Sequence, residues 1–203
     1  MRLLIFDRTC VRKGGGLSVP WFAGSYLYRG LRRIDRAKGV ASWDEAFAWI
    51  RKSDEPIDEL QYWGHGLWGR VMIDREALTA DALLAKHEHH AGLLALKERL
   101  APNALVWFRT CSAFGAKPGI AFAEQLSDFL GARVAGHTYV IGFHQSGLHG
   151  LAPGARADWD PAEGLESGSA AMPLSSLPSR TSAPHTITCL HNSVRDDWFS
   201  TRG

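Results

Sequence analysis

Apolar residues in this chain occur in two patterns, short continuous blocks and longer stretches with helical spacing. The continuous blocks are too short for ordinary helices and predict strands that are buried on both faces. They cover residues 3–6, 60–63 and 104–108. Strands are expected over 3–6, 57–63, 104–108, 133–142 and 186–190, and shorter extended pieces at 69–74 and around Val40. Strands of this kind are typical of a parallel sheet that helices cover.

Stretches with helical spacing separate these blocks. A first helix is expected over 20–39 and a second over 42–50, where Ser42 and Glu45 have the spacing of a capping box. Further helices are expected over 79–100 and 118–131. The apolar side of the first helix would consist of Phe22, Tyr26 or Leu27, Leu31 and Ile34. The alternation of strands and helices predicts a three-layer α/β/α fold with a mainly parallel central sheet.

The pattern weakens beyond Gly147. Residues 166–184 are rich in serine, alanine and proline, which predicts a long flexible loop. The block at 186–190 is expected to return to the sheet as its last strand. A chain of 203 residues suffices for one domain with a substantial core, so a single domain over 1–203 is expected.

Composition narrows the classes of function. Apolar residues make up 45% and charged residues 22% of the chain, as in ordinary globular proteins. A net charge of +2, from 23 basic and 21 acidic side chains, lacks the basic excess that nucleic-acid binding requires, so no nucleic acid is expected as a partner. No apolar run is long enough for a membrane span, and residues 3–6 are too short for a secretory signal.

The three cysteines, Cys10, Cys111 and Cys189, are odd in number and far apart in the sequence. This spacing argues against a disulfide framework and favours a reducing compartment. A cytoplasmic location is therefore expected.

His65 and Cys111 each follow a predicted buried strand. His65 stands just after the block at 57–63, and Cys111 just after the block at 104–108. Because open α/β sheets place their chemistry at the carboxyl ends of their strands, the two side chains are expected at the same sheet edge. An imidazole there would take or share the thiol proton and increase the amount of thiolate. The pair predicts a nucleophilic cysteine with a histidine base.

With these residues the chain resembles the caspase-like cysteine peptidases, the clan that also contains legumain, gingipains, separase and metacaspases. The resemblance rests on His65-Gly66 and Cys111 after their apolar blocks, and on residues 119–142, which look like the helix and strand after the cysteine in bacterial caspase-like domains. His65 lies 46 residues before Cys111, and in caspases the histidine lies about 50 residues before the cysteine. The sequence Arg109-Thr110-Cys111 differs from the Gln-Ala-Cys of caspases, so aspartate specificity is not implied.

This resemblance implies a cysteine endopeptidase of caspase-like fold that hydrolyses protein or peptide substrates through a thioester and uses no cofactor. The backbone N–H groups of Gly66 and Cys111 are implied to bind the oxyanion, where positioned donors are commonly worth a few kcal/mol. Processing near Arg180, calcium or an activating partner would be possible switches. A catalytically inactive caspase-like module that binds a protein partner is the alternative.

The residues that would set substrate specificity give opposite predictions. Asp7, at the end of the first strand, would favour a basic substrate residue, whereas Arg109 and Arg8 would favour an acidic one. Trp68, close to His65, is a further candidate for the substrate groove.

Two other kinds of site are disfavoured. The glycines at 14–16 lack the remaining residues of a phosphate-binding loop, which argues against a flavodoxin-like nucleotide binder. His87, His89 and His90 invite a metal site, but no second cluster supplies further ligands at a known spacing. No metal is therefore expected.

Overall fold

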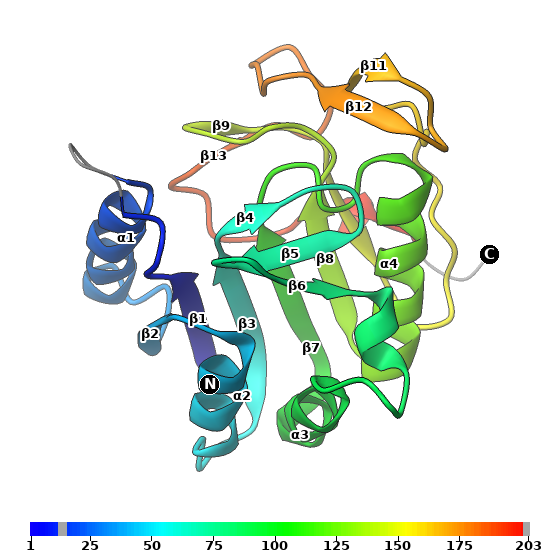
Figure 1. Cartoon of the computed structure of the whole chain (residues 1–203). Helices are drawn as coiled ribbons and strands as arrows, with labels where there is room; N and C mark the ends of the chain where they lie inside the picture. The colour runs from blue at the N-terminus through cyan, green and yellow to red at the C-terminus, as the bar shows by residue number, and fades with distance from the viewer. Residues whose placement is uncertain (12–15, 201–203) are drawn as a thin grey trace.

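A seven-stranded sheet runs through the molecule, of which the computed structural model describes residues 1–11 and 16–200 (Figure 1). The strand order is β14, β10, β8, β7, β3, β1, β2. The five strands from β8 to β2 are mutually parallel, β10 is antiparallel to β8, and β14 is parallel to β10. Their bounds are β1 Arg2–Asp7, β2 Arg36–Val40, β3 Ile57–Trp63, β7 Leu100–Arg109, β8 Arg133–His137, β10 Leu148–Leu151 and β14 Phe199–Ser200.

Helices cover both faces of this sheet. Leu3 and Ile5 of β1 belong to the core beneath α2, α3 and α4, whereas Leu4 and Phe6 belong to the core beneath α1. Residues near the carboxyl terminus, including Trp198, pack on the rest of the second face. The helices are α1 Ser18–Gly30, α2 Trp43–Arg51, α3 His90–Arg99, α4 Ala116–Leu130, η1 Ala80–Leu83 and η2 Asp196–Trp198. The predicted three-layer α/β/α fold with a mainly parallel sheet is confirmed.

Three small sheets accompany the central one. The first contains β4 His65–Gly66, β5 Arg70–Ile73 and β6 Glu76–Thr79. The second pairs β9 His144–Gln145 with β13 Ile187–Thr188, and the third pairs β11 Leu165–Gly168 with β12 Pro173–Ser176. Figure 1 places β4, β9 and β13 at the end of the sheet where β3 and β7 finish. These pieces therefore surround the edge at which the chemistry is expected.

Several predicted elements are confirmed closely. The strand at 57–63 has the predicted bounds, and the block at 104–108 forms the buried part of β7. The hydroxyl of Ser42 accepts the Glu45 N–H at 3.1 Å, and a carboxylate oxygen of Glu45 accepts the Ala41 N–H at 2.8 Å. These two hydrogen bonds fix the start of α2. Gly131 ends α4 with a φ of 64°.

The predicted apolar side of the first helix is wrong. Phe22, Tyr26, Leu27 and Leu31 are exposed, while Ser25 and Tyr28 are buried. The reason is the close approach of α1 to the sheet, because a Cβ atom at Gly24 would lie only 2.8 Å from the Trp63 ring. The side of α1 that faces the sheet therefore carries small side chains. It also carries Tyr28, whose hydroxyl hydrogen-bonds to the backbone oxygens of Cys189 and His191. The helix ends at Gly30, and the residues beyond it include the predicted edge strand, β2.

Two predictions for the last part of the chain also need correction. Part of the expected loop at 166–184 forms the paired strands β11 and β12. Residues 187–188 pair with β9 and not with the central sheet, whose last strand is β14. The apolar block was a correct sign of burial, since Ile187 is buried, but periodicity does not identify the partner strand.

His87 and His89 lie in the connection between η1 and α3, and His90 begins α3, so the cluster divides the helix expected over 79–100. His89 is buried against Phe47, with Nε2 at 3.5 Å from Glu76 Oε1. In the described part of the chain, no helix is both long and apolar enough to cross a membrane.

Candidate functional site

His65 and Cys111 follow neighbouring strands of the central sheet. β3 and β7 are parallel, and Trp63 is opposite Arg109 in their register. His65 and Cys111 each come two residues after this matched pair. Because adjacent strands are only about 5 Å apart, this register brings the two backbones to neighbouring positions at the carboxyl end of the sheet.

Both side chains line one cavity of about 420 Å³. Its walls come from α1, from the ends of β3 and β7, and from the segments 141–145 and 189–190. Most of the apolar wall consists of Trp21, Leu27, Tyr28, Trp63, Phe143 and Leu190. A thiol and an imidazole therefore meet at a cavity of the size that small ligands and side chains occupy.

A second cysteine, Cys10, contacts His65, with its Sγ at 3.2 Å from the histidine Nε2. The contact follows from the strand order, because β3 lies between β7 and β1, and Cys10 comes three residues after β1. The ring of Trp21 packs edge-on against His65 at 5.5 Å between centroids. The histidine is thus supplied by the strand between the two strands that supply the thiols.

Within the described residues, Cys111 makes no hydrogen bond to His65. Its Sγ lies 3.9 Å from the backbone oxygen of Ile141. Burial raises the pKa of Cys111 above its ordinary value. The thiol is therefore protonated at neutral pH in this structure, and a base is needed to ionise it.

The turn after Cys111 is fixed by backbone hydrogen bonds to two other segments. Ser112 N–H donates to Tyr139 O at 2.9 Å, and Trp68 N–H donates to Ser112 O at 2.9 Å. Ser112 has a φ of 48°, a left-handed conformation that is uncommon for a residue with a side chain. The hydrogen bonds hold the Cys111 backbone in place relative to the segment that carries His65.

Gly66 packs directly against this turn. A Cβ atom at Gly66 would lie 2.4 Å from Thr110 Oγ1 and 2.9 Å from Cys111 O, so only glycine fits. Among residues 1–11 and 16–200, the backbone N–H of Cys111 has no acceptor in another residue. This arrangement is compatible with the oxyanion role expected for Gly66 and Cys111, which stays a prediction.

Two candidate specificity residues lie outside the lining of this cavity. Asp7 is fully buried, and its carboxylate accepts hydrogen bonds from the N–H and the hydroxyl of Thr9 at 2.7 and 2.6 Å. Trp68 is half-buried, and its Nε1–H donates to Ser176 Oγ of β12 at 3.1 Å. Neither side chain is placed to select a substrate residue in the cavity beside Cys111.

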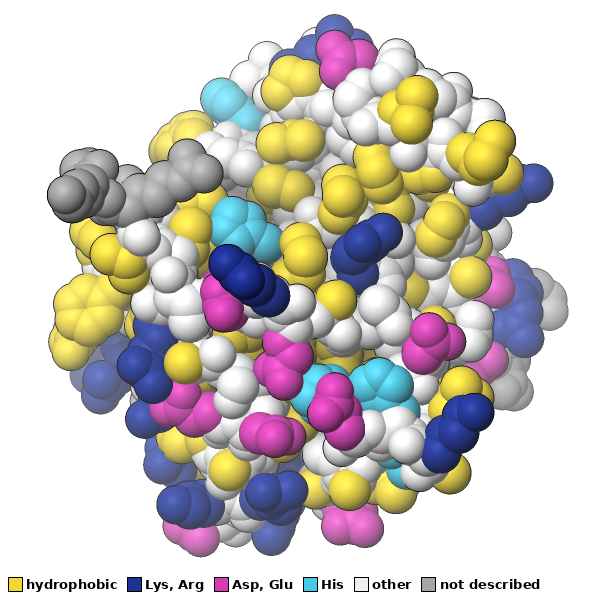
Figure 2. All heavy atoms as spheres, in the orientation of Figure 1, with side chains coloured by type: hydrophobic (Ala, Val, Ile, Leu, Met, Phe, Trp, Pro, Cys, Tyr) yellow, Lys and Arg dark blue, Asp and Glu magenta, His cyan; other side chains and the backbone are white. Residues whose placement is uncertain are grey.

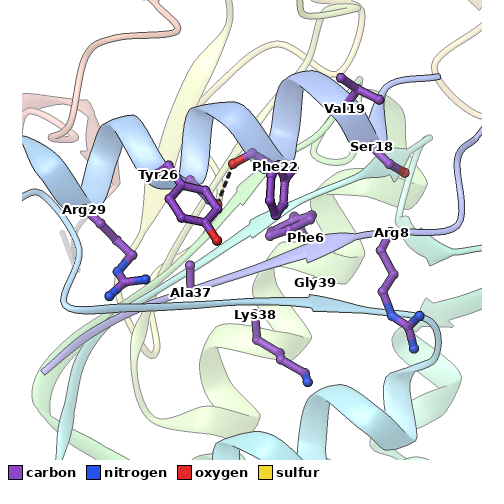
Figure 3. A pocket seen from close by; sticks show the side chains of 11 residues that line it. Phe6, Arg8, Ser18, Val19, Phe22, Tyr26, Arg29, Ala37, Lys38 and Gly39 are labelled. Carbon is purple, nitrogen blue, oxygen red and sulfur yellow. Dashed lines mark hydrogen bonds between the residues drawn. The ribbon is translucent and has the colours of Figure 1, made fainter. Parts of the chain in front are cut away.

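Arg8 lines a different cavity, of about 480 Å³, between α1 and the β1–β2 edge of the sheet (Figure 3). Its guanidinium donates to Glu45 at 3.1 Å. Phe22 and Tyr26 lie over this cavity from α1. In the described part of the chain, neither a histidine nor a cysteine lines it, so it lacks the chemistry found beside His65.

Arg109 is the predicted specificity residue that does line the cavity. Its Nε–H and one NH2 hydrogen donate to Gln145 Oε1 at 3.0 and 2.8 Å, and NH1 donates to Tyr28 Oη at 2.6 Å and His191 O at 3.0 Å. The second NH2 hydrogen donates to Cys189 O at 3.0 Å. All five guanidinium hydrogens are thus used by neutral oxygen atoms. Burial lowers the pKa of Arg109 from its ordinary value.

His137, at the end of β8, is fully buried beneath the site. Its backbone oxygen accepts the Phe114 N–H at 3.0 Å, and its Nδ1 lies 3.1 Å from Ser146 O. Burial, and after it the charge of Arg109, lowers the pKa of His137 to about 3. The imidazole of His137 is therefore neutral at all ordinary pH values.

Acid should destabilise the protein through His137. A histidine in the unfolded chain takes up a proton near pH 6.5, whereas His137 in the folded protein stays neutral down to about pH 3. In this window only the unfolded state binds the proton, so the free energy of unfolding falls with pH. Between about pH 7.5 and about pH 5 the loss from this group is about 2 kcal/mol. Urea denaturation at both pH values measures it.

The matched variant for this prediction is His137→Asn, which keeps a donor for Ser146 O and removes the titrating ring. The variant is expected to lose about 2 kcal/mol less than the wild type on acidification, whatever its stability at neutral pH. An equal pH dependence of the two proteins would show that His137 is not the acid-sensitive group.

Sequence reasoning assigned no role in the site to Cys10, Tyr28 or Gln145. Cys10 follows the first strand much as His65 and Cys111 follow theirs, which is a usable signal. The signal becomes specific only when β1 is known to be next to β3. Tyr28 and Gln145 belong to α1 and β9, and no motif marks either residue.

Acidic and basic side chains are interspersed on the face seen in Figure 2, in keeping with the small net charge. Over the described ranges, no group of three or more histidine, cysteine, aspartate or glutamate side chains is arranged to hold a metal ion. Comparison with protein-family models, with curated proteins and with solved structures finds no match to this chain.

Proposed function

We propose that the chain is a caspase-like cysteine peptidase in which Cys111 is the nucleophile and His65 the base. The observation that carries the proposal is the position of these two residues, at the ends of neighbouring parallel strands and in the wall of one cavity. The helix α4 and the strand β8 that follow Cys111 support the resemblance to bacterial caspase-like domains.

In the proposed reaction, His65 takes the thiol proton as Cys111 Sγ attacks the carbonyl carbon of the scissile peptide bond. The tetrahedral oxyanion accepts hydrogen bonds from the backbone N–H groups of Gly66 and Cys111. The intermediate collapses to a thioester, and the leaving amine takes the proton from His65. Water then hydrolyses the thioester with His65 as base, which releases the acid and regenerates the thiol.

In this scheme the His65 imidazole must leave the thiol of Cys10 and contact the thiol of Cys111. In the structure the imidazole contacts Cys10, while the Cys111 thiol is held protonated by burial. The substrate must therefore bring His65 and Cys111 into hydrogen-bond contact when it fills the cavity. Catalytic hydrogen bonds commonly tighten only in the complex with substrate, so this requirement is ordinary.

The substrate is a protein or peptide, and no cofactor takes part. A reducing compartment keeps the nucleophile as a thiol, which is why we place the activity in the cytoplasm. Cys10, Cys111 and Cys189 are unpaired thiols, in agreement with such a compartment.

A second candidate is a catalytically inactive caspase-like module that binds a protein partner. The contact of His65 with Cys10, and not with Cys111, favours this alternative, because a protonated buried thiol without a base is a poor nucleophile. The two candidates differ in the reactivity of Cys111.

The test is to react the purified protein with a library of peptidyl electrophiles and to map the modified cysteine by mass spectrometry. The peptidase predicts modification at Cys111, faster than at Cys10 or Cys189. His65→Ala should slow the modification of Cys111 about 100-fold or more, as loss of a catalytic base does. His144→Ala is the matched control, because His144 belongs to the segment 141–145 but is not among the residues that line the cavity.

Modification of Cys111 at the rate of an ordinary thiol, with no dependence on His65, would favour the inactive module. Fast modification of Cys10 in its place would reassign the nucleophile to the thiol that contacts His65.

A further inference from the structure

We infer that the cavity beside Cys111 receives a large apolar side chain of the substrate, aromatic above all, at the residue before the scissile bond. The inference rests on the proposed peptidase for the position of the bond, but the preference itself follows from the lining. Among the described residues the lining offers no carboxylate to a basic substrate residue, and its one arginine already has every N–H hydrogen-bonded.

The walls of the cavity are aromatic and aliphatic. Trp21 and Leu27 project from α1, Trp63 ends β3, and Phe143 and Leu190 come from two segments near the carboxyl end of the sheet. A volume of about 420 Å³ holds an aromatic side chain together with the adjoining backbone. Burial of such a side chain is the largest favourable contribution that a wall of this kind can make.

A basic substrate residue is disfavoured by charge. Among the described residues, no aspartate or glutamate lines the cavity, and Asp7 is bonded to Thr9 outside the lining. The permanent cation in the wall is Arg109, which is 4% exposed. A second cation next to it would meet like-charge repulsion and would lose its water without gaining a carboxylate partner.

An acidic substrate residue is attracted by Arg109 but finds no free N–H on its guanidinium. Every N–H of the guanidinium already donates to a neutral oxygen of Gln145, Tyr28, Cys189 or His191. The guanidinium also lies over the ring of Trp107, at 4.6 Å from the ring centroid. A carboxylate would have to break this network to bind Arg109, and it would otherwise lose hydration without pairing with the guanidinium.

The first experiment measures binding without catalysis. Acetylated peptide amides that differ only in their last residue, phenylalanine, leucine, aspartate or arginine, are titrated into the Cys111→Ala protein while tryptophan fluorescence is followed. The phenylalanine peptide should bind at least about tenfold more tightly than the aspartate and arginine peptides, with the leucine peptide between them.

The second experiment changes the charge of the cavity. Leu27→Asp, in the Cys111→Ala background, places a carboxylate on the wall and should raise the affinity for the arginine peptide about tenfold while lowering that for the phenylalanine peptide. Leu31→Asp is the matched control. Leu31 lies one helical turn after Leu27 and is similarly exposed, at 50% against 47%, but it does not line the cavity. The control should leave the order of affinities unchanged.

Equal affinities for the four peptides, or tighter binding of the aspartate or arginine peptide, would overturn the inference. Selective binding of the phenylalanine peptide supports it even where the wild-type protein hydrolyses none of the corresponding substrates. Such a lack of hydrolysis would count against the peptidase alone, so the two proposals can fail separately.

Discussion

Cys111→Ala should reduce the hydrolysis of a peptide substrate with phenylalanine before the scissile bond at least about 1,000-fold in kcat/KM. The thioester cannot form without the thiol, and the residual rate reflects only substrate binding and the oxyanion donors. His65→Ala should cost about 100-fold to 10,000-fold, the contribution of a positioned base. Steady-state kinetics on wild type and variants, with circular dichroism as a check on folding, measures both losses.

Cys10→Ala is the decisive control for this prediction. Cys10 is the thiol that contacts His65, at 3.2 Å, but it does not line the cavity. If Cys111 is the nucleophile, Cys10→Ala should keep kcat/KM within about tenfold of the wild type, since the loss of one exchangeable partner of His65 leaves the base in place. A loss as large as that of Cys111→Ala would identify Cys10 as the nucleophile.

The central strands could be predicted from the sequence because they are buried on both faces. Residues 60–63 and 104–108 contain no charged side chain. These residues are buried in β3 and β7. Helices on both sides of a parallel sheet produce this pattern. The same reasoning placed His65 and Cys111 at strand ends, and the register between β3 and β7 agrees with it.

The strands at the other side of the sheet leave no such pattern. β10 contains His149 and Gly150, and a Cβ atom at Gly150 would lie 2.4 Å from the Phe199 ring of β14. The pairing of these strands thus depends on the absence of a side chain, which hydrophobic periodicity cannot register.

The composition of the cavity was also beyond sequence reasoning. The charges of Asp7, Arg8 and Arg109 lead to opposite expectations only while all three are assumed to face the substrate. In the fold the carboxylate of Asp7 is hydrogen-bonded to Thr9, and the guanidinium of Arg8 lies in a separate cavity. All N–H groups of Arg109 donate to neutral oxygens. Contacts formed in the folded chain, and not the residue types alone, decide which charged side chains can reach a substrate.

Arg109→Leu should lower the free energy of unfolding by about 1–3 kcal/mol, the cost of leaving buried hydrogen-bond acceptors without their donors. The side chain is 4% exposed, and its loss leaves Gln145 Oε1 and the backbone oxygens of Cys189 and His191 without these donors. Urea denaturation at neutral pH measures the change. Arg75→Leu is the control, because Arg75 is exposed and should shift stability by no more than about 0.5 kcal/mol.

Arg109→Lys separates the charge from the network. A lysine keeps the positive charge but donates from a single nitrogen, so it cannot serve Gln145, Tyr28 and the 189–191 backbone together. Its loss of stability should lie between those of Arg75→Leu and Arg109→Leu. If Arg109→Leu were as stable as the control, the network would be dispensable. The walls that α1, β9 and the segment after β13 contribute to the cavity would then be held by apolar packing alone.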